Sequence, residues 1–366
     1  MFLAKNFTKQ QYYHLISQIM NKPYFKLFSN CLPVKGYTQS IIYDLQFGRI
    51  EYIPNLLFDI LKHLTNKTVV EIKNFYEQEY NEGIDNYLKH LADSGFGFYT
   101  DSPKMFPDID LTWDNPFEIT NLVIDNCFDL ILGSKLNVSV DDLTLIIRKN
   151  AEEVCYKLES INEKIRSRSL QIFLPYHESL LDIIFDSLSS FNKVKQLVIY
   201  EAPEHSVNQK GAIQIISTKN KIEFAHNRNN VHPNYFTQNI TLFTEAQNYH
   251  TYFNRKAFID MNGNIKLSPE HVDLIGNINE LNANIDIMDI IKKSNFKVLW
   301  NIKKDDTLVC KDCEFRYMCI DTRIPIKFSD RFWSHKVDCN YNPLLGKWKW
   351  EDGYKNVADL SIDLTD

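Results

Sequence analysis

The chain has 366 residues, of which 44% are hydrophobic, so it has enough apolar material for two or three domains. Its formal net charge of −6 argues against a dedicated nucleic-acid binder, which normally carries a basic stripe. The 11 glycines form neither of the glycine-rich motifs that cradle nucleotide phosphates. No apolar run approaches the ~18 residues of a membrane span, and the first residues lack the layout of a signal peptide. Together these features predict a cytoplasmic protein with no nucleic-acid or membrane partner.

The first 105 residues are expected to form one small domain in which strands precede three short helices. A helix is also expected over residues 1–20. Pro54 lies at the start of the first of the three helices, where its fixed φ is tolerated. This order of elements is typical of a winged-helix domain. The strands are predicted over 24–28, 40–45, 49–53 and 96–100, and the helices over 55–64, 69–80 and 83–93.

Residues 101–118 contain three prolines and several acidic residues, and they are expected to form a linker. Beyond it, apolar stretches alternate with helical ones, a pattern that indicates parallel strands joined by helices. Residues 106–240 are therefore predicted to form a partial β/α barrel. The expected strands cover 120–124, 170–174, 194–200, 211–216 and 221–224, and the expected helices cover 151–165 and 178–188.

Four of the seven cysteines fall within thirty residues, as Cys310-x2-Cys313-x5-Cys319 and then Cys339. A C-x2-C pair directs two thiolates from one tight turn toward a common point. Four sulfurs suit either zinc or an iron–sulfur cluster. Disulfides are disfavoured, because a chain of this length needs no covalent staples in a reducing compartment. Cys310, Cys313, Cys319 and Cys339 are therefore the predicted metal ligands.

This spacing resembles the SPASM domain, the cluster-binding module of many radical-SAM enzymes that modify peptides. Gly263-x4-Ser268 and the turn at 276–278 are similar to the family's G-x4-C hairpin and its "GNI" turn. Ser268 stands where that family has a cysteine, Arg323 stands at another cysteine position, and a third family cysteine is absent upstream. By the family's ligand assignment, the retained cysteines serve the second of two auxiliary clusters. The resemblance thus implies one [4Fe–4S] cluster; zinc is the alternative, because both accept four thiolates.

The motif that binds the catalytic cluster of radical-SAM enzymes, C-x3-C-x2-C, is missing. The corresponding place after the first predicted barrel strand keeps only Cys127, and Ile131 stands where the second thiolate would be. One thiolate cannot hold a cluster that needs three, so no radical-SAM chemistry is expected. Cys127 is interpreted as a small buried residue, and no catalytic residue is assigned.

The N-terminal domain resembles the leader-peptide recognition domain of many ribosomal-peptide maturases. The resemblance implies that a precursor's leader adds as a strand beside residues 49–53 and leans on the third helix. Backbone hydrogen bonds would then give affinity, and apolar pockets would give specificity. The predicted peptide-binding residues are Arg49, Ile50, Glu51, Tyr52, Ile53, Tyr87 and Leu91.

The combination is similar to the SPASM-domain maturase of "grasp-with-spasm" systems, which make ribosomally synthesised and post-translationally modified peptides. That resemblance implies two partners, a precursor peptide and an ATP-grasp ligase, and a SPASM-like domain over 241–366. Since no motif for activating SAM or ATP is visible, an accessory role in recognition is favoured over catalysis. Two alternatives remain: an iron–sulfur redox enzyme acting on a peptide, and a structural-zinc interaction protein.

Overall fold

A computed structural model describes residues 23–149, 151–178, 184–185, 187–188, 191–223, 231–293 and 297–360. The fold is mixed α/β: one large, mostly parallel sheet is accompanied by several small antiparallel sheets. This confirms the coarse fold class expected from the sequence. None of the helices in the described ranges combines the length and the apolar character that a membrane crossing requires.

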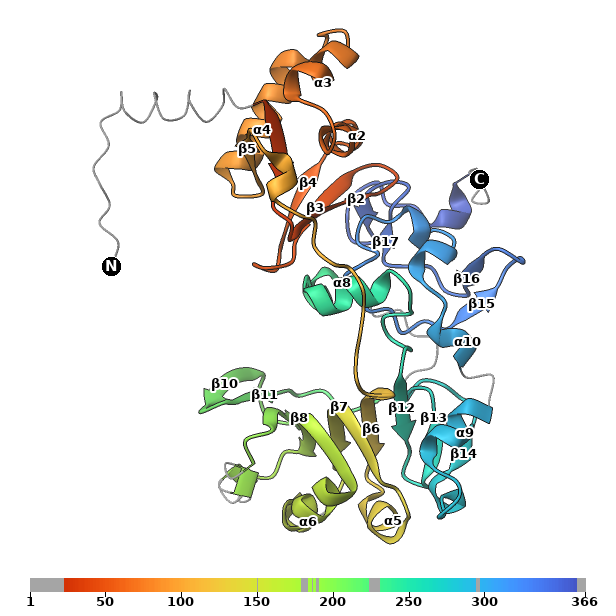
Figure 1. Ribbon diagram of the computed structural model, residues 1–366. Helices are drawn as coiled ribbons and strands as arrows, with labels where there is room; N and C mark the ends of the chain where they lie inside the picture. The colour runs from red at the N-terminus through yellow and green to blue at the C-terminus, as the bar shows by residue number, and fades with distance from the viewer. Residues whose placement is uncertain are drawn as a thin grey trace, which may run out of the picture.

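Residues 23–100 hold two small sheets and three helices, at the top of Figure 1. One sheet has the order β2-β3-β4, so β4 lies at an edge. A capping box between Thr68 and Glu71 fixes the start of α3. The elements are β1 (Tyr24–Leu27), β2 (Cys31–Lys35), β3 (Ser40–Asp44), β4 (Arg49–Ile53), α2 (Asn55–Leu64), α3 (Val69–Phe75), α4 (Asn81–Asp93) and β5 (Gly97–Thr100), which pairs with β1.

The large sheet has nine strands among the described residues, in the order β10-β11-β9-β8-β7-β6-β12-β13-β14. The strands from β11 to β12 in that order run parallel, and α5 and α6 lie together below the sheet in Figure 1. The bounds are β6 (Ile119–Asp125), α5 (Phe128–Gly133), β7 (Val138–Ile146), α6 (Ala151–Lys164), β8 (Ile165–Pro175), β9 (Val194–Tyr200), β10 (Ser206–Lys210), β11 (Ile213–Ser217), β12 (Lys256–Ile259), β13 (Asn264–Lys266) and β14 (Gly276–Asn277). The sheet therefore extends across the predicted boundary between the second and third domains, which lies between residues 240 and 241.

The remaining elements are short and surround the cysteine-rich stretch. The helices are α8 (Ile240–Ala246), α9 (Ile287–Lys293) and α10 (Lys297–Trp300), and the strands are β15 (Pro325–Lys327), β16 (Trp333–His335), β17 (Tyr341–Asn342) and β18 (Lys347–Trp348). Short 3₁₀ turns cover η1 (Pro103–Met105), η3 (Pro233–Tyr235), η4 (Ile278–Glu280), η5 (Lys304–Asp306), η6 (Cys310–Asp312) and η7 (Val357–Asp359).

Several predicted elements match the structure. The helix over 55–64 and the strands over 49–53 and 194–200 are confirmed with the same bounds. The helix expected over 69–80 ends at Phe75, because the backbone turns through positive φ at Glu77 and Gln78.

Other expectations differ from the structure. Residues 221–223 form no strand, and the hairpin partner of β11 is β10. Strands β2 and β7 were not expected. The helix predicted over 1–20 lies outside the described residues, and the one predicted over 178–188 lies largely outside them.

Candidate functional site

All four predicted metal ligands line one small cavity. Cys319 is buried, and Cys310, Cys313 and Cys339 are half-buried. The wall also contains apolar rings and charged side chains. Besides the cysteines, the lining residues include Val231, Phe236, Phe315 and Tyr341.

The turn that presents the first two thiols has a strained backbone. Cys310 lies in η6, and the amide of Cys313 donates to the carbonyl of Cys310 at 3.1 Å. Val309, just before this turn, has φ +68° and ψ −46°. A β-branched residue rarely adopts positive φ, and such strain concentrates at functional sites. The strained residue therefore lies directly beside a predicted ligand.

Burial disfavours the thiolate forms of Cys313, Cys319 and Cys339. It raises the pKa of Cys313 and of Cys319 well above the ordinary thiol value, and it raises the pKa of Cys339 to about 11. Neighbouring thiols add to the effect at Cys313. A bound metal favours the thiolate instead, so these thiols and a metal cation stabilise one another.

The four thiols are spread around the cavity rather than drawn to one point. Among the described residues, the one group of three potential ligand atoms lying within 4.8 Å of one another is Cys310, Asp321 and His335. The four sulfurs form no such close group. A tetrahedral zinc with Zn–S bonds of ~2.3 Å would hold its sulfurs about 3.8 Å apart.

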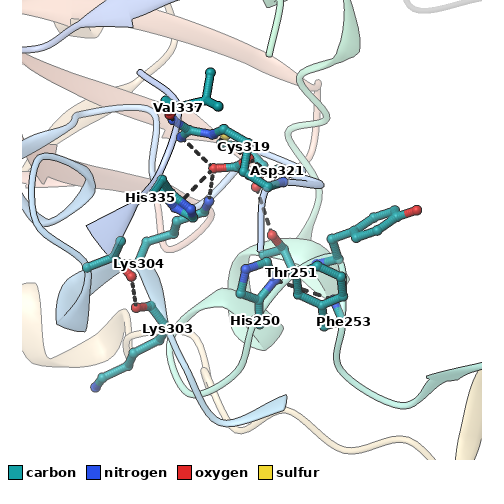
Figure 2. A network of polar contacts seen from close by, with 12 residues as sticks. His250, Thr251, Phe253, Lys303, Lys304, Cys319, Asp321, His335 and Val337 are labelled. Carbon is teal, nitrogen blue, oxygen red and sulfur yellow. Dashed lines mark hydrogen bonds and ion pairs between the residues drawn. The ribbon is translucent and has the colours of Figure 1, made fainter. Parts of the chain in front are cut away.

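The Asp321 carboxylate already has a full set of hydrogen-bond donors. Its Oδ2 accepts from Lys304 Nζ at 2.7 Å and from Arg323 at 2.7 Å, and its Oδ1 accepts from Arg323 Nε at 2.9 Å. Figure 2 shows Asp321 with Lys304 and His335 converging on it; His335 Nε2 lies 3.5 Å from Oδ2. Asp321 is thus the anion of a buried salt-bridge network, and the close group with Cys310 and His335 has no free carboxylate with which to bind a metal.

The charges of this network are stabilised mutually. Although burial opposes ionisation, Arg323 and Lys304 hold the pKa of Asp321 well below its usual range, and Asp321 in turn raises the pKa of Lys304. Burial lowers the pKa of His335 to about 3, so its imidazole is neutral. Lys304 and Asp321 were not anticipated from the sequence, because single charged residues carry no spacing signal, whereas the nearness of His335 to Cys339 had suggested it as a minor alternative ligand.

The two positions where cysteines of the resembled family are replaced lie in different surroundings. Arg323 lines the thiol cavity and joins the salt-bridge network through Asp321. Its Nη1 also donates to the carbonyl of Val337 at 2.7 Å. Ser268 is buried beyond the end of β13 and does not line the cavity. At position 323, a cation therefore lies in the cavity wall itself.

Most of the predicted peptide-binding residues surround a single groove. Between β4 and α4 lies a groove, beside the edge of the β2-β3-β4 sheet. Tyr52 is 53% exposed and Tyr87 is 43% exposed, so both rings are accessible to a ligand. The predicted residues that line the groove are Glu51, Tyr52, Ile53, Tyr87 and Leu91; Leu57, Gly83, Asn86 and His90, which were not predicted, line it too.

Arg49 and Ile50 do not line this groove. The Arg49 side chain instead clamps the hairpin between β3 and β4, where its Nε donates to Asp44 Oδ2 at 2.8 Å. Its guanidinium also lies over the ring of Phe96, 4.4 Å from the centroid. Within the groove, His90 Nε2 lies 2.7 Å from Glu51 Oε1 and links β4 to α4.

The groove and the thiol cavity share a wall. Tyr52, which lines the groove, contacts Phe315, which lines the cavity, with 6.2 Å between ring centroids. The β2-β3-β4 sheet packs on the cysteine-rich stretch through one apolar cluster that contains Ile41, Tyr43 and Phe315.

Hydrogen bonds fasten the same two regions together. Tyr43 Oη donates to the carbonyl of Glu314 at 2.8 Å, and the amide of Tyr37 donates to the carbonyl of Asp312 at 2.8 Å. The turn after β2 is held by Arg316, whose Nη1 donates to a backbone carbonyl of β2 at 2.7 Å. The cysteine-bearing loop is therefore the direct support of the sheet that carries the groove.

In comparisons with known proteins, no family model matches the sequence and no curated protein matches it.

Proposed function

We propose that this chain binds the leader of a precursor peptide during maturation of a ribosomally synthesised, post-translationally modified peptide. The bound peptide is then modified by a separate ATP-grasp ligase. The observation that carries the proposal is the groove between β4 and α4, because it combines an edge strand with an apolar floor and two accessible tyrosines. An edge strand offers unpaired backbone groups to an extended peptide, and pockets beside it select alternate side chains.

The four cysteines are proposed to hold one [4Fe–4S] cluster. Two observations support a cluster over zinc: the thiols surround a common cavity, and they form no close group of the size that a tetrahedral zinc needs. A cluster places a core of iron and sulfide between its thiolates and so suits the wider arrangement. When bound, it would anchor the loop from Cys310 to Cys339, and it could also exchange electrons.

The peptide proposal is tested by selecting binders from a displayed library of random linear peptides on the full chain. Selected peptides should bind through their backbones. N-methylation at alternate residues of a selected peptide should therefore abolish binding in one of the two registers and spare it in the other. Equal loss in both registers, or in neither, contradicts strand addition.

Variants locate the binding surface. Tyr52→Ser and Tyr87→Ser should each weaken binding of the selected peptides by about tenfold or more, because each removes an aromatic contact at the groove. Phe75→Ser is the matched control: Phe75 is an exposed ring on α3 that does not line the groove. If Phe75→Ser weakens binding as much as Tyr87→Ser does, the peptide binds elsewhere.

A further inference from the structure

We propose that the trio of Lys304, Asp321 and Arg323 compensates the negative charge of a tetrathiolate metal centre. Arg323 supplies the excess positive charge of the trio. The inference rests on the proposed metal centre and assigns a role to residues that are not ligands. It predicts that the net charge of this trio sets how tightly the centre is held and, for an iron–sulfur cluster, its reduction potential.

The trio lies at the cavity wall and is almost completely removed from water. Asp321 is 0% exposed, Lys304 is 3% exposed and Arg323 is 4% exposed, and all three line the cavity with the cysteines. Arg323 grips the carboxylate with two parallel hydrogen bonds, and Lys304 adds a third at 2.7 Å. Two buried cations share one buried anion, so the trio keeps one uncompensated positive charge.

An uncompensated buried charge is costly unless an opposite charge lies nearby. Among the described side chains that line the cavity, Asp321 is the one carboxylate, and the further cation Arg316 is paired with Asp305 at 3.1 Å, so no lining group balances the trio. Four thiolates around a divalent core, whether one zinc ion or an oxidised [4Fe–4S] core, carry two negative charges in total. The surplus charge of the trio and the charge of such a centre therefore compensate each other. A zinc centre and an oxidised iron–sulfur centre have the same net charge in this respect.

The electrostatic interaction partners agree with this geometry. Cys310 and Cys339 are among the groups that raise the pKa of Arg323, after Asp321, and Cys310 and Cys319 act in the same way on Lys304. These cysteines are thus close enough to interact with both cations. Because the interior screens charge weakly, a unit charge at this wall has a large effect on the centre.

The test separates charge from structure with four variants of the full chain. Arg323→Met lowers the trio's charge from plus one to zero. Asp321→Asn raises the charge to plus two, and the double variant restores it to plus one. All three of these variants lose the paired hydrogen bonds between Arg323 and Asp321. Arg323→Lys keeps the charge but loses the planar two-point grip.

Each variant is loaded anaerobically with iron and sulfide, and in parallel with zinc, and release to a chelator is followed. Arg323→Met should release metal about 10–100-fold faster than the unmodified chain. The double variant should recover most of that loss, and Arg323→Lys should remain near the unmodified rate. In iron-loaded samples, the reduction potential should rise in the order Arg323→Met, double variant, Asp321→Asn.

The outcomes distinguish the two proposals. If the unmodified chain retains neither metal, there is no centre to compensate, and both proposals fall. If the metal is retained but the double variant releases it as fast as Arg323→Met or faster, the trio acts through structure. The proposal of charge compensation is then overturned, and the proposal of a metal centre stands. Comparing unfolding temperatures with and without metal shows whether a variant has simply failed to fold.

Discussion

At the residue scale, the cysteine-bearing loop has interactions that conflict when no metal is bound. Val309 has a positive φ beside the first ligand, and burial raises the pKa of Cys313 and of Cys319. Arg323 and Lys304 leave a surplus positive charge at the same cavity wall. Each feature costs free energy by itself, and each cost is reduced by one anionic tetrathiolate centre. The local strain and the local electrostatics therefore both favour the proposed tetrathiolate centre.

Cys313→Ser tests whether this centre stabilises the fold. Because binding free energy at such a site contributes to folding free energy, losing one ligand should lower the unfolding midpoint by more than about 5 °C and remove the bound metal. Metal analysis and thermal unfolding measure the two effects. Cys127→Ser is the control: Cys127 is buried in the core of the large sheet, so that variant should keep its metal. Unchanged metal content in Cys313→Ser would exclude it as a ligand.

Asp44 makes the N-terminal sheet sensitive to acid. Its buried carboxylate accepts hydrogen bonds from Arg49, Asn30 and the amides of Gln46 and Phe47, which outweigh burial and hold its pKa below the ordinary value. A lowered folded-state pKa adds stability above the unfolded value of about 3.9, and this stability is lost as pH falls through the folded pKa.

The stability of the unmodified chain should therefore drop more steeply below about pH 4 than that of Asp44→Asn, whose amide does not titrate. Denaturant unfolding at a series of pH values measures both slopes. Parallel slopes for the two proteins would show that Asp44 contributes nothing to acid sensitivity. Because Arg49 donates to the Asp44 carboxylate, loss of this carboxylate should also disturb the hairpin between β3 and β4.

At the element scale, the strands that sequence reasoning missed are those that local rules disfavour. β2 contains Pro33, and a proline normally argues against a strand. However, β2 lies at the edge of its sheet, where a proline is tolerated. β7 contains Asp141 and Asp142, residues that strands normally avoid.

Tertiary partners compensate for both aspartates: Asp141 accepts from Asn115 at 3.0 Å, and Asp142 accepts from Asn121 at 3.2 Å. Such partners are distant in sequence and leave no local pattern. The C-x2-C turn and the helix that follows Pro54 could be predicted because their signals are local. The salt-bridge network around Asp321 could not, since it depends on where the chain returns to the cavity.

Gly36 lies in the turn between β2 and β3 where the N-terminal sheet meets the cysteine-bearing loop. A Cβ there would lie 2.5 Å from the carbonyl oxygen of Gln39 and 2.8 Å from Glu314 Oε2. Gly36→Ala should therefore destabilise the chain by about 1–3 kcal/mol, because the turn must move away from Glu314. Denaturant unfolding measures the loss. Gly133→Ala is the matched control, since a Cβ at Gly133 meets nothing within 4 Å and should be neutral or slightly stabilising. Equal stability of the two variants would mean that this contact is not tight.

At the scale of the whole molecule, the proposed metal centre and the proposed peptide groove are parts of one structural unit. The loop that bears Cys310, Cys313 and Cys319 packs against β3 and reaches the groove through Phe315 and Tyr52. Few regular hydrogen bonds define this loop by itself, since its only regular elements are short turns. Whatever orders the loop also supports the edge strand to which the peptide would add. Occupancy of one site should then raise affinity at the other, by the same factor in both directions.

Metal removal tests this linkage without knowledge of the natural peptide. Treating the loaded chain with a chelator should increase amide hydrogen exchange in β3 and β4 by about tenfold or more, because local opening becomes easier once the loop is released. The parallel strands β6 to β9 are the internal control, since their core is a separate cluster that does not include the cavity cysteines, and their exchange should not change. Mass spectrometry of peptide fragments resolves the regions. Faster exchange confined to residues 310–339, with β3 and β4 still protected, would mean that the metal centre and the groove are energetically independent. Faster exchange in β4 would instead predict that peptides selected on the loaded chain bind the metal-free chain more weakly.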